Sequence, residues 1–130
     1  MTDLELLSLA SKARKRAYAP YSDYTVGAAL LCADGKVFLG CNIENAAFTP
    51  TVCAERCAIQ AAVCDGERDF LKIAIVGGRR EEADGFASPC GVCRQVMAEF
   101  CRGDFEIILL KDGSVHKETL DSVLPCRFFL

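Results

Sequence analysis

Hydrophobic and polar residues alternate along the chain with two different periods. In three segments apolar residues recur at the spacing of one helix face, which predicts helices over residues 2–19, 52–64 and 90–101. Short apolar runs bounded by turn residues predict strands over 24–31, 36–40, 71–77, 106–110 and 115–117. One further helical turn or two is expected within 119–124. This order of elements predicts an α/β fold of three layers, in which a mixed five-stranded sheet carries helices on both faces.

Residues at the ends of the predicted helices support their placement. Thr2 and Glu5 fit a capping box at the start of the first helix. The Asp65-Gly66 pair provides a stop for the second helix. For the third helix we expect Ser88 as the N-cap, with Pro89 at the first helical position.

The sequence also indicates which part of the first helix faces solvent and where a helix packs on a strand. Its last turns carry four basic residues, which we interpret as a solvated helix face near the negative end of the dipole: Lys12, Arg14, Lys15 and Arg16. The small residues at 27–29 predict that a helix packs closely on the strand that contains them.

Composition limits the classes of partner. At 130 residues the chain is expected to form a single domain over 1–130. Hydrophobic residues make up 52% of it, which favours an oligomer, but no apolar run approaches the ~18 residues of a membrane span. A net charge of −3 without a basic stripe argues against a nucleic-acid polymer as the partner.

Cysteine usage indicates the compartment. The chain has nine cysteines with scattered spacing, and its N-terminus lacks the charged-then-apolar pattern of a secretion signal. We therefore expect reduced thiols and a cytoplasmic location.

Two motifs carry the candidate chemistry, Cys53-Ala54-Glu55 and Pro89-Cys90-Gly91-Val92-Cys93. Each lies at a predicted helix start, so three thiolates can converge on one Zn²⁺ per chain. Structural zinc sites have four protein ligands, whereas three leave a position for water, whose pKa falls toward ~7. Glu55 follows one ligand by two residues and is placed to act as the base for that water.

Charge compensation brings in one more residue. Three thiolates on Zn²⁺ leave one net negative charge, which would keep the pKa of the water high. The positive ends of two helix dipoles offset this charge, and Arg56 can donate to a thiolate sulfur. The other six cysteines are interpreted as small core residues, and His116, the only histidine, as a surface residue that binds no metal.

Polar residues cluster directly before the first cysteine motif, at Asn42, Glu44 and Asn45. Ordinary loop polarity and a binding role are about equally supported by their position alone.

Taken together, these motifs resemble the small, homotetrameric, zinc-dependent cytidine deaminases over nearly the whole chain. The segments that carry the resemblance are 19–22, 26–30, 40–46 (Gly-Cys-Asn-Ile-Glu-Asn-Ala), 53–56, 88–96 and 124–125.

The resemblance implies hydrolytic deamination of cytidine, and of 2′-deoxycytidine, to uridine and ammonia in pyrimidine salvage. In this reaction a zinc-bound hydroxide attacks the base and Glu55 shuttles the protons. Asn42 and Glu44 would hold the ribose hydroxyls, Tyr24 would pack against the base, and Ala54 with Glu55 would read the edge of the pyrimidine.

The resemblance further implies a homotetramer with shared active sites, to which aromatics matching Phe48 and Phe128 contribute from neighbouring subunits. Two departures affect this part. Phe48 lacks the hydroxyl that many relatives carry as Tyr, and Cys126-Arg127 replaces smaller residues after Leu124-Pro125.

Three other readings share parts of the pattern. A deaminase of polynucleotide cytosines would need basic grooves and stacking aromatics. A deaminase of a cytosine-containing antibiotic is closer, and Asn42 with Glu44 argues against it. A structural zinc module would need a fourth protein ligand and would have no use for Glu55.

Overall fold

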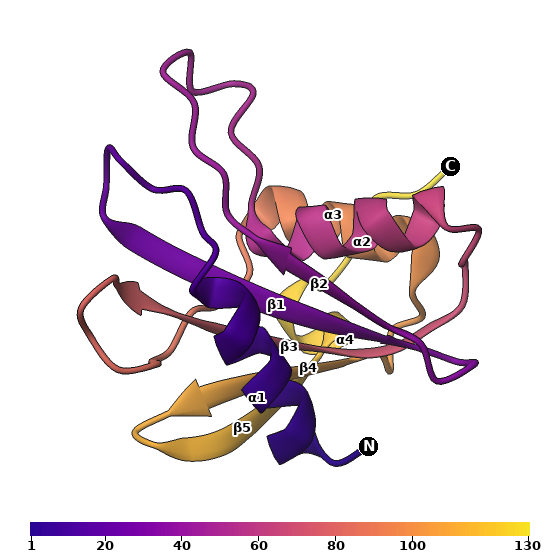
Figure 1. Ribbon diagram of the computed structural model, residues 1–130. Helices are drawn as coiled ribbons and strands as arrows, with labels where there is room; N and C mark the ends of the chain where they lie inside the picture. Colours follow the sequence, from indigo (N-terminus) through magenta and orange to yellow (C-terminus); the bar gives the residue numbers. More distant parts are fainter.

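The computed structural model describes residues 1–130 and is built around one five-stranded sheet (Figure 1). The strands are β1 (Tyr24–Cys32), β2 (Val37–Cys41), β3 (Phe70–Arg79), β4 (Glu106–Lys111) and β5 (Ser114–Thr119). Their spatial order is β2-β1-β3-β4-β5, and only β3 and β4 run parallel to each other. The predicted mixed five-stranded sheet is therefore confirmed.

Four helices cover the two faces of this sheet: α1 (Asp3–Arg14), α2 (Ala54–Cys64), α3 (Gly91–Phe100) and α4 (Leu120–Val123). Figure 1 shows α1 on one side and the other helices on the opposite side. Alternate strand residues enter two separate cores, as the two-residue period of a strand requires. Leu30 packs with α2, α3 and α4, whereas its neighbour Leu31 packs with α1. The three predicted layers are thus present.

Two glycines allow the helices to approach the strands. A Cβ at Gly27 would lie 2.0 Å from the carbonyl oxygen of Ala10, and a Cβ at Gly40 would lie 2.3 Å from that of Ala54. Both positions therefore exclude any larger residue. The close packing predicted around Gly27 is confirmed, and Gly40 fixes the first turn of α2 against β2.

The helix ends agree with the prediction in two cases and differ in two. The prediction that the first helix extends to residue 19 is wrong, because α1 ends at Arg14 and Tyr18 instead forms a bridge with Ile43. The Thr2 capping box is present, and Gly66 follows α2 with a φ of +94°. The prediction of Ser88 as the N-cap of α3, with Pro89 at the first helical position, is wrong. The helix begins at Gly91 and Cys90 is its N-cap, with a Sγ that accepts from the backbone N–H of Cys93 at 3.4 Å. The hydroxyl of Ser88 instead accepts a hydrogen bond from Arg94 Nη2 at 3.0 Å.

The basic end of α1 is only partly a solvated face. Lys12, Lys15 and Arg16 are exposed, but Arg14 is buried, so the interpretation was wrong for that residue. The reason is tertiary, since Thr25 and Asp84 both bind the Arg14 guanidinium.

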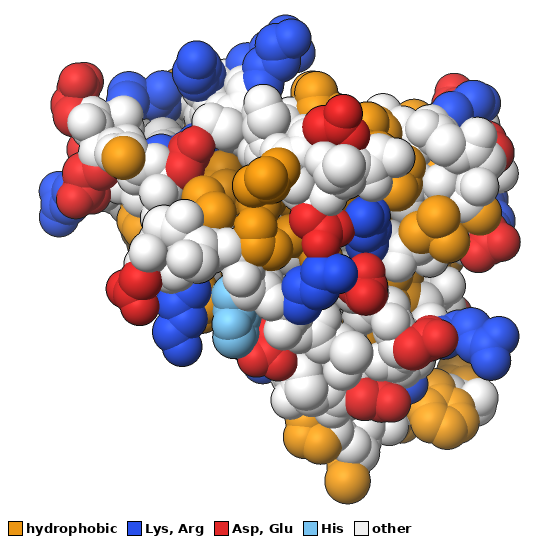
Figure 2. Space-filling view, turned by 90° about the horizontal axis from the view of Figure 1, so that it is seen from below, with side chains coloured by type: hydrophobic (Ala, Val, Ile, Leu, Met, Phe, Trp, Pro, Cys, Tyr) orange, Lys and Arg blue, Asp and Glu red, His pale blue; other side chains and the backbone are white.

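The surface carries charged side chains of both signs (Figure 2). Acidic and basic side chains lie next to one another over much of the face seen in Figure 2, where the pale blue side chain is His116. Its Nε2 lies 3.0 Å from Oε1 of Glu118, and the side chain is partly exposed, as predicted. None of the helices combines the length and apolar character that crossing a membrane requires.

Candidate metal centre and substrate pocket

Three thiols meet where α2 and α3 begin. Cys53 is the N-cap of α2, Cys90 is the N-cap of α3, and Cys93 lies in the first turn of α3. All three Sγ atoms lie within 4.8 Å of one another, and those of Cys53 and Cys90 are 3.7 Å apart. Two thiolates bound about 2.3 Å from a tetrahedral zinc lie about 3.8 Å from each other, so this donor set fits Zn²⁺.

Hydrogen bonds among the thiols shift their pKa values in opposite directions. The hydrogen bond from the Cys93 thiol lowers the pKa of Cys53, and the same contact raises the pKa of Cys93. Arg56 lies one turn along α2, and its Nη2 donates to Cys53 Sγ at 3.4 Å. This is the contact expected of a residue that compensates thiolate charge.

Arg56 has one further property. Its Nε is the only buried side-chain nitrogen or oxygen without a hydrogen-bond partner. The guanidinium therefore lies close to the thiols without being saturated by other acceptors.

Glu55 is the acidic group beside the thiols. Its side chain is 4% exposed, and burial raises its pKa to about 7. No ion pair in the structure includes it. A carboxyl group whose pKa lies near neutrality can both accept and release a proton during turnover.

A cavity of about 340 Å³ opens onto this centre. It is lined by two of the thiol residues together with predicted substrate residues: Cys53, Cys90, Glu55, Ala54, Tyr24, Asn42 and Glu44. The sequence interpretation missed Ser22, Thr51 and Phe86, which also line it. Ser22 lies inside segment 19–22, one of those that carry the family resemblance, and this was the available signal, whereas Phe86 carried none.

Glu44 is held firmly at the wall of the cavity. Its Oε1 accepts from the backbone N–H groups of Tyr21 at 2.9 Å and Ser22 at 3.2 Å, and its Oε2 accepts from the Ser22 hydroxyl. The hydroxyl of Ser22 is the largest cause of a lowered pKa for Glu44. The carboxylate is therefore ionised and oriented before any ligand binds.

Asn42 is bound to the backbone of β1. Its Oδ1 accepts from Val26 N–H at 2.8 Å, and its Nδ2 donates to the carbonyl of Tyr24 at 2.8 Å. An amide oxygen has a second lone pair and an amide nitrogen has a second proton, so Asn42 retains one acceptor and one donor for a ligand.

Tyr24 and Ala54, the other two predicted substrate residues that line the cavity, differ in exposure. Tyr24 is 41% exposed, and its hydroxyl donates to the carbonyl of Phe86 at 3.4 Å, whereas Ala54 is fully buried. Tyr24 thus presents an aromatic surface to the cavity, while Ala54 lines it from the first turn of α2.

Phe48 and Phe128 are not brought to the cavity of their own chain. They are 75% and 69% exposed, and Phe48 lines a neighbouring hollow with Tyr21 and Asn45. The carbonyl of Phe128 accepts from Gln95 Nε2 at 3.0 Å.

The six other cysteines divide by burial. Cys32 and Cys101 are buried, and Cys41 and Cys57 are half-buried. Cys64 and Cys126 are exposed, so their interpretation as core residues was wrong. Cys64 is the last residue of α2 and Cys126 follows α4, and chain segments at helix ends turn toward solvent.

Known proteins are similar to this chain in sequence and in fold. Residues 1–109 match the model of the cytidine and deoxycytidylate deaminase zinc-binding region. A cytidine deaminase from Sporosarcina psychrophila is 46% identical over 125 residues, which cover 95% of this chain and 89% of that protein. A blasticidin-S deaminase from Bacillus cereus is 32% identical over 130 residues, which cover 97% of this chain and 91% of that protein.

Solved structures agree with the sequence match. The crystal structure of cytidine deaminase from Burkholderia pseudomallei superimposes with a TM-score of 0.90 at 45% identity, covering 98% of this chain and 100% of that chain. Because both the family model and these relatives extend over most of its length, the chain belongs to the family of zinc-binding cytidine and deoxycytidylate deaminases.

Proposed function

We propose that this chain catalyses the hydrolytic deamination of cytidine, and of 2′-deoxycytidine, to uridine and ammonia. The observation that carries the proposal is the position of Glu55, a buried carboxyl group with a pKa near 7 beside three converging thiols. The same cavity contains polar groups suited to a sugar.

Cys53, Cys90 and Cys93 would hold the zinc, which would supply an acidified water as the nucleophile for C4 of the base. Glu55 takes a proton from that water and delivers it to N3 of the pyrimidine. The same carboxyl group then takes the proton that remains on the attacking oxygen and moves it to the amino group, which leaves as ammonia. One carboxyl group can perform both transfers because it lies beside the metal ligands without needing to bind the metal.

The sugar side of the cavity supports a nucleoside as the substrate. Glu44 can accept from a ribose hydroxyl. Asn42 can donate to a hydroxyl through its free N–H and accept from one through the free lone pair of its Oδ1. No Lys, Arg or His lines this cavity or the adjoining hollow. A 5′-phosphate would find no cation there and would lie near the anionic Glu44, which disfavours deoxycytidylate.

A second candidate is supported by the relative named as a blasticidin-S deaminase. It would use the same thiols and the same acid, so the metal centre does not distinguish the two activities. Glu44 with Asn42 argues for the nucleoside, because groups arranged for sugar hydroxyls are left unpaired by a ligand that lacks them.

We also propose a homotetramer with shared sites, formed by residues 1–130 acting as one domain. The exposure of Phe48 and Phe128 supports this assembly, because each is an aromatic side chain free to enter the cavity of a neighbouring copy. The nine free thiols support a reducing compartment, and we assign the enzyme to pyrimidine salvage in the cytoplasm.

The decisive experiment is an ultraviolet assay of the zinc-loaded protein. Cytidine, 2′-deoxycytidine, cytosine, deoxycytidylate, blasticidin S and a short single strand would be compared at equal concentration. We expect the two nucleosides to be deaminated most efficiently by kcat/KM. Equal efficiency with cytosine or deoxycytidylate would contradict the nucleoside assignment, and faster turnover of blasticidin S would favour the second candidate.

A further inference from the structure

Arg14 is a buried cation on the face of the sheet opposite the metal centre. Its side chain is 7% exposed. Nε donates to Thr25 Oγ1 at 2.9 Å, Nη1 to Asp84 Oδ1 at 2.8 Å, and Nη2 to the carbonyl of Arg79. One guanidinium therefore joins α1 to a middle strand, to the end of β3 and to the loop that follows β3.

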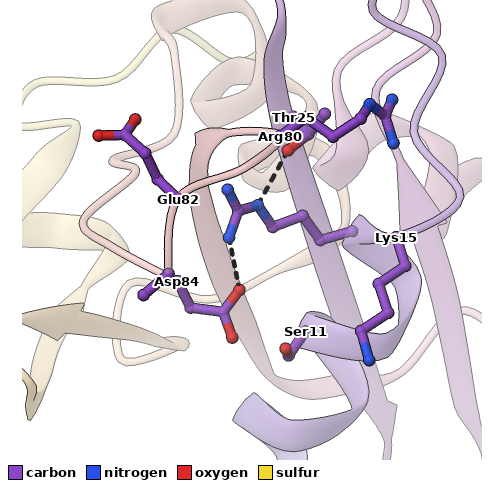
Figure 3. Close-up of a pocket in the computed structure, with 8 residues that line it drawn as sticks. Ser11, Lys15, Thr25, Arg80, Glu82 and Asp84 are labelled. Atoms are coloured by element: carbon purple, nitrogen blue, oxygen red, sulfur yellow. Dashed lines mark hydrogen bonds and ion pairs between the residues drawn. The ribbon is translucent and has the colours of Figure 1, made fainter.

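That loop has little hydrophobic packing of its own. Residues 79–83 are exposed, and a hollow of about 470 Å³ separates part of the loop from α1 (Figure 3). Only one of the eight residues that line the hollow is hydrophobic. The loop is thus held mainly by polar contacts, of which Arg14–Asp84 joins it to α1.

The same loop continues into the wall of the substrate cavity. Phe86 lies two residues after Asp84 and lines that cavity, and its carbonyl accepts from the Tyr24 hydroxyl. A bridge between Gly77 and Gly85 joins the loop to β3, with hydrogen bonds of 2.8 and 3.2 Å.

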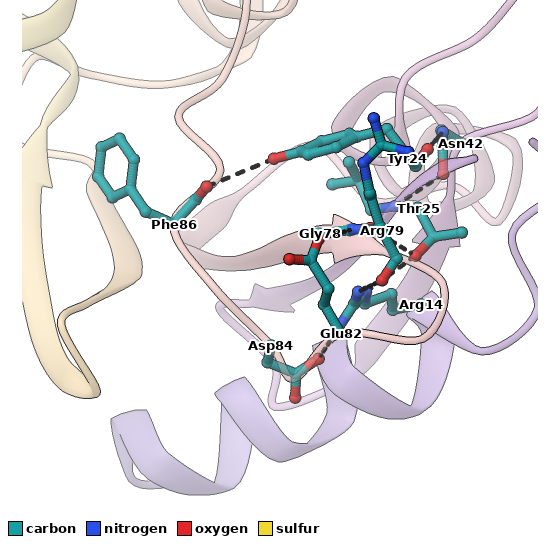
Figure 4. A network of polar contacts seen from close by, with 10 residues as sticks. Arg14, Tyr24, Thr25, Asn42, Gly78, Arg79, Glu82, Asp84 and Phe86 are labelled. Carbon is teal, nitrogen blue, oxygen red and sulfur yellow. Dashed lines mark hydrogen bonds and ion pairs between the residues drawn. The ribbon is translucent and has the colours of Figure 1, made fainter. Parts of the chain in front are cut away.

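The opposite wall is joined to Arg14 through β1. Thr25, which binds Arg14, lies between Tyr24 and Val26, whose side chains line the cavity from the other face of the strand. Asn42 binds the backbone of both flanking residues. Figure 4 shows the contacts of Asn42 with Tyr24 and those of Arg14 with Thr25 and Asp84, and the backbone of β1 joins the two groups.

We propose that Arg14 is a positioning residue for the substrate pocket. By tying Asp84 to Thr25 it sets the separation between Phe86 on one wall and Tyr24 with Asn42 on the other. The proposal rests on the proposed function, because those walls are the ones that would contact the base and the sugar.

Arginine suits this task better than lysine. The planar guanidinium presents several N–H groups in a fixed fork, so it can bind three acceptors in different directions, whereas an ammonium group is a compact point charge. Glu55 and the thiols are placed by α2 and α3 rather than by this loop. Loosening the loop should therefore weaken substrate binding more than it slows the chemical step.

The test compares Arg14→Lys, Asp84→Asn and a matched control, Glu81→Gln. Glu81 lies in the same loop, is exposed, and takes part in no hydrogen bond or ion pair, so its substitution removes the same charge without touching Arg14. For each zinc-loaded variant, KM and kcat for cytidine, the inhibition constant of uridine, zinc content and Tm would be measured well below Tm.

We expect Asp84→Asn and Arg14→Lys to raise KM and the uridine inhibition constant in parallel by roughly three- to tenfold, since one charge-assisted hydrogen bond is worth about that much or more. Zinc content and kcat should stay near wild type, and Glu81→Gln should change nothing. If Arg14→Lys does not fold, Asp84→Asn alone decides the outcome.

Two results would overturn the positioning role. One is an Asp84→Asn enzyme with wild-type KM and uridine inhibition constant, even if its Tm is lower, since that describes a purely structural contact. The other is a loss confined to kcat. Wild-type protein that fails to deaminate cytidine would instead contradict the proposed function, so the two failures are distinguishable.

Discussion

The chain buries two ionisable side chains on opposite faces of its sheet, and the two differ in how they are paired. Arg14 is buried and donates to three protein acceptors, one of them a carboxylate. Glu55 is 4% exposed and has no ion-pair partner, and burial raises its pKa to about 7. Burying a charge is unfavourable unless the charge is paired and hydrogen-bonded, and only Arg14 meets this condition.

This difference separates a structural charge from a catalytic one. A fully paired guanidinium stays charged and fixes the elements around it. A carboxyl group without a cation is left able to exchange a proton, which a proton shuttle requires. Residues that contradict stability rules beside a group of metal ligands are therefore good candidates for function.

The largest expected effect comes from Glu55→Gln. The side chain is nearly isosteric but carries no proton between atoms, so kcat should fall by about 10²–10⁴-fold while zinc content is kept. Removing a buried ionisable group should leave Tm unchanged or higher. Steady-state kinetics with metal analysis would check this, and near-normal kcat with full zinc would remove Glu55 from the mechanism.

For Arg14→Met we expect a loss of stability with little change in kcat, the reverse of the result expected for Glu55→Gln. Asp84 and Thr25 would lose their buried partner, so the free energy of unfolding should fall by about 3 kcal/mol. Because the metal centre lies across the sheet, kcat of the folded fraction should be retained. Urea unfolding monitored by circular dichroism would measure the loss, with the exposed Arg16→Met as the control. Equal stability of the two variants would contradict the structural role of Arg14.

Glu44→Ala tests a carboxylate that shares features of both residues, because it is hydrogen-bonded to the protein as Arg14 is and lines the substrate cavity as Glu55 does. Its loss should lower kcat/KM for cytidine by roughly 10- to 100-fold, the usual value of a hydrogen bond to a charged group. Cytosine has no sugar, so its deamination should change little. The ratio of the two kcat/KM values measures the effect, and an unchanged ratio would argue that Glu44 does not bind the sugar.

The smallest effect concerns the pH dependence of Ser22→Ala. The Ser22 hydroxyl lowers the pKa of Glu44, so in wild type Glu44 stays ionised until the pH falls below its usual range. Its contribution to binding is present above that range and is lost as the pH falls through the lowered pKa. In Ser22→Ala this loss should begin at a higher pH.

The Ser22→Ala measurement is KM for cytidine between about pH 4 and 7, with Ser22→Thr as the variant that keeps the hydroxyl. Coincident KM profiles for Ser22→Ala and wild type would show that Ser22 does not tune Glu44.

Local patterns in the sequence were enough to predict the helices and strands, apart from the end of the first helix, and the convergence of the thiols. The helical period over 52–64, the apolar run over 71–77 and the turn residues between strands are short-range signals, and hydrophobic burial converts them directly into elements. Cys-x-x-Cys with a second cysteine motif at another helix start predicted the meeting of Cys53, Cys90 and Cys93, because helix starts on one side of a sheet lie at one edge.

Contacts between distant residues were decided only by the tertiary structure. Arg14 and Asp84 are 70 residues apart, and nothing near Arg14 in the sequence distinguishes it from the exposed basic residues beside it. Ser22 and Glu44 meet only because two loops are joined by the β1–β2 pairing. Cys90, not Ser88, is the N-cap of α3, and the Ser88 hydroxyl accepts from Arg94, which lies in the helix itself. Periodicity records which residues are buried, but the choice of partner for a buried polar group depends on which strands become neighbours, and that is fixed only when the sheet forms.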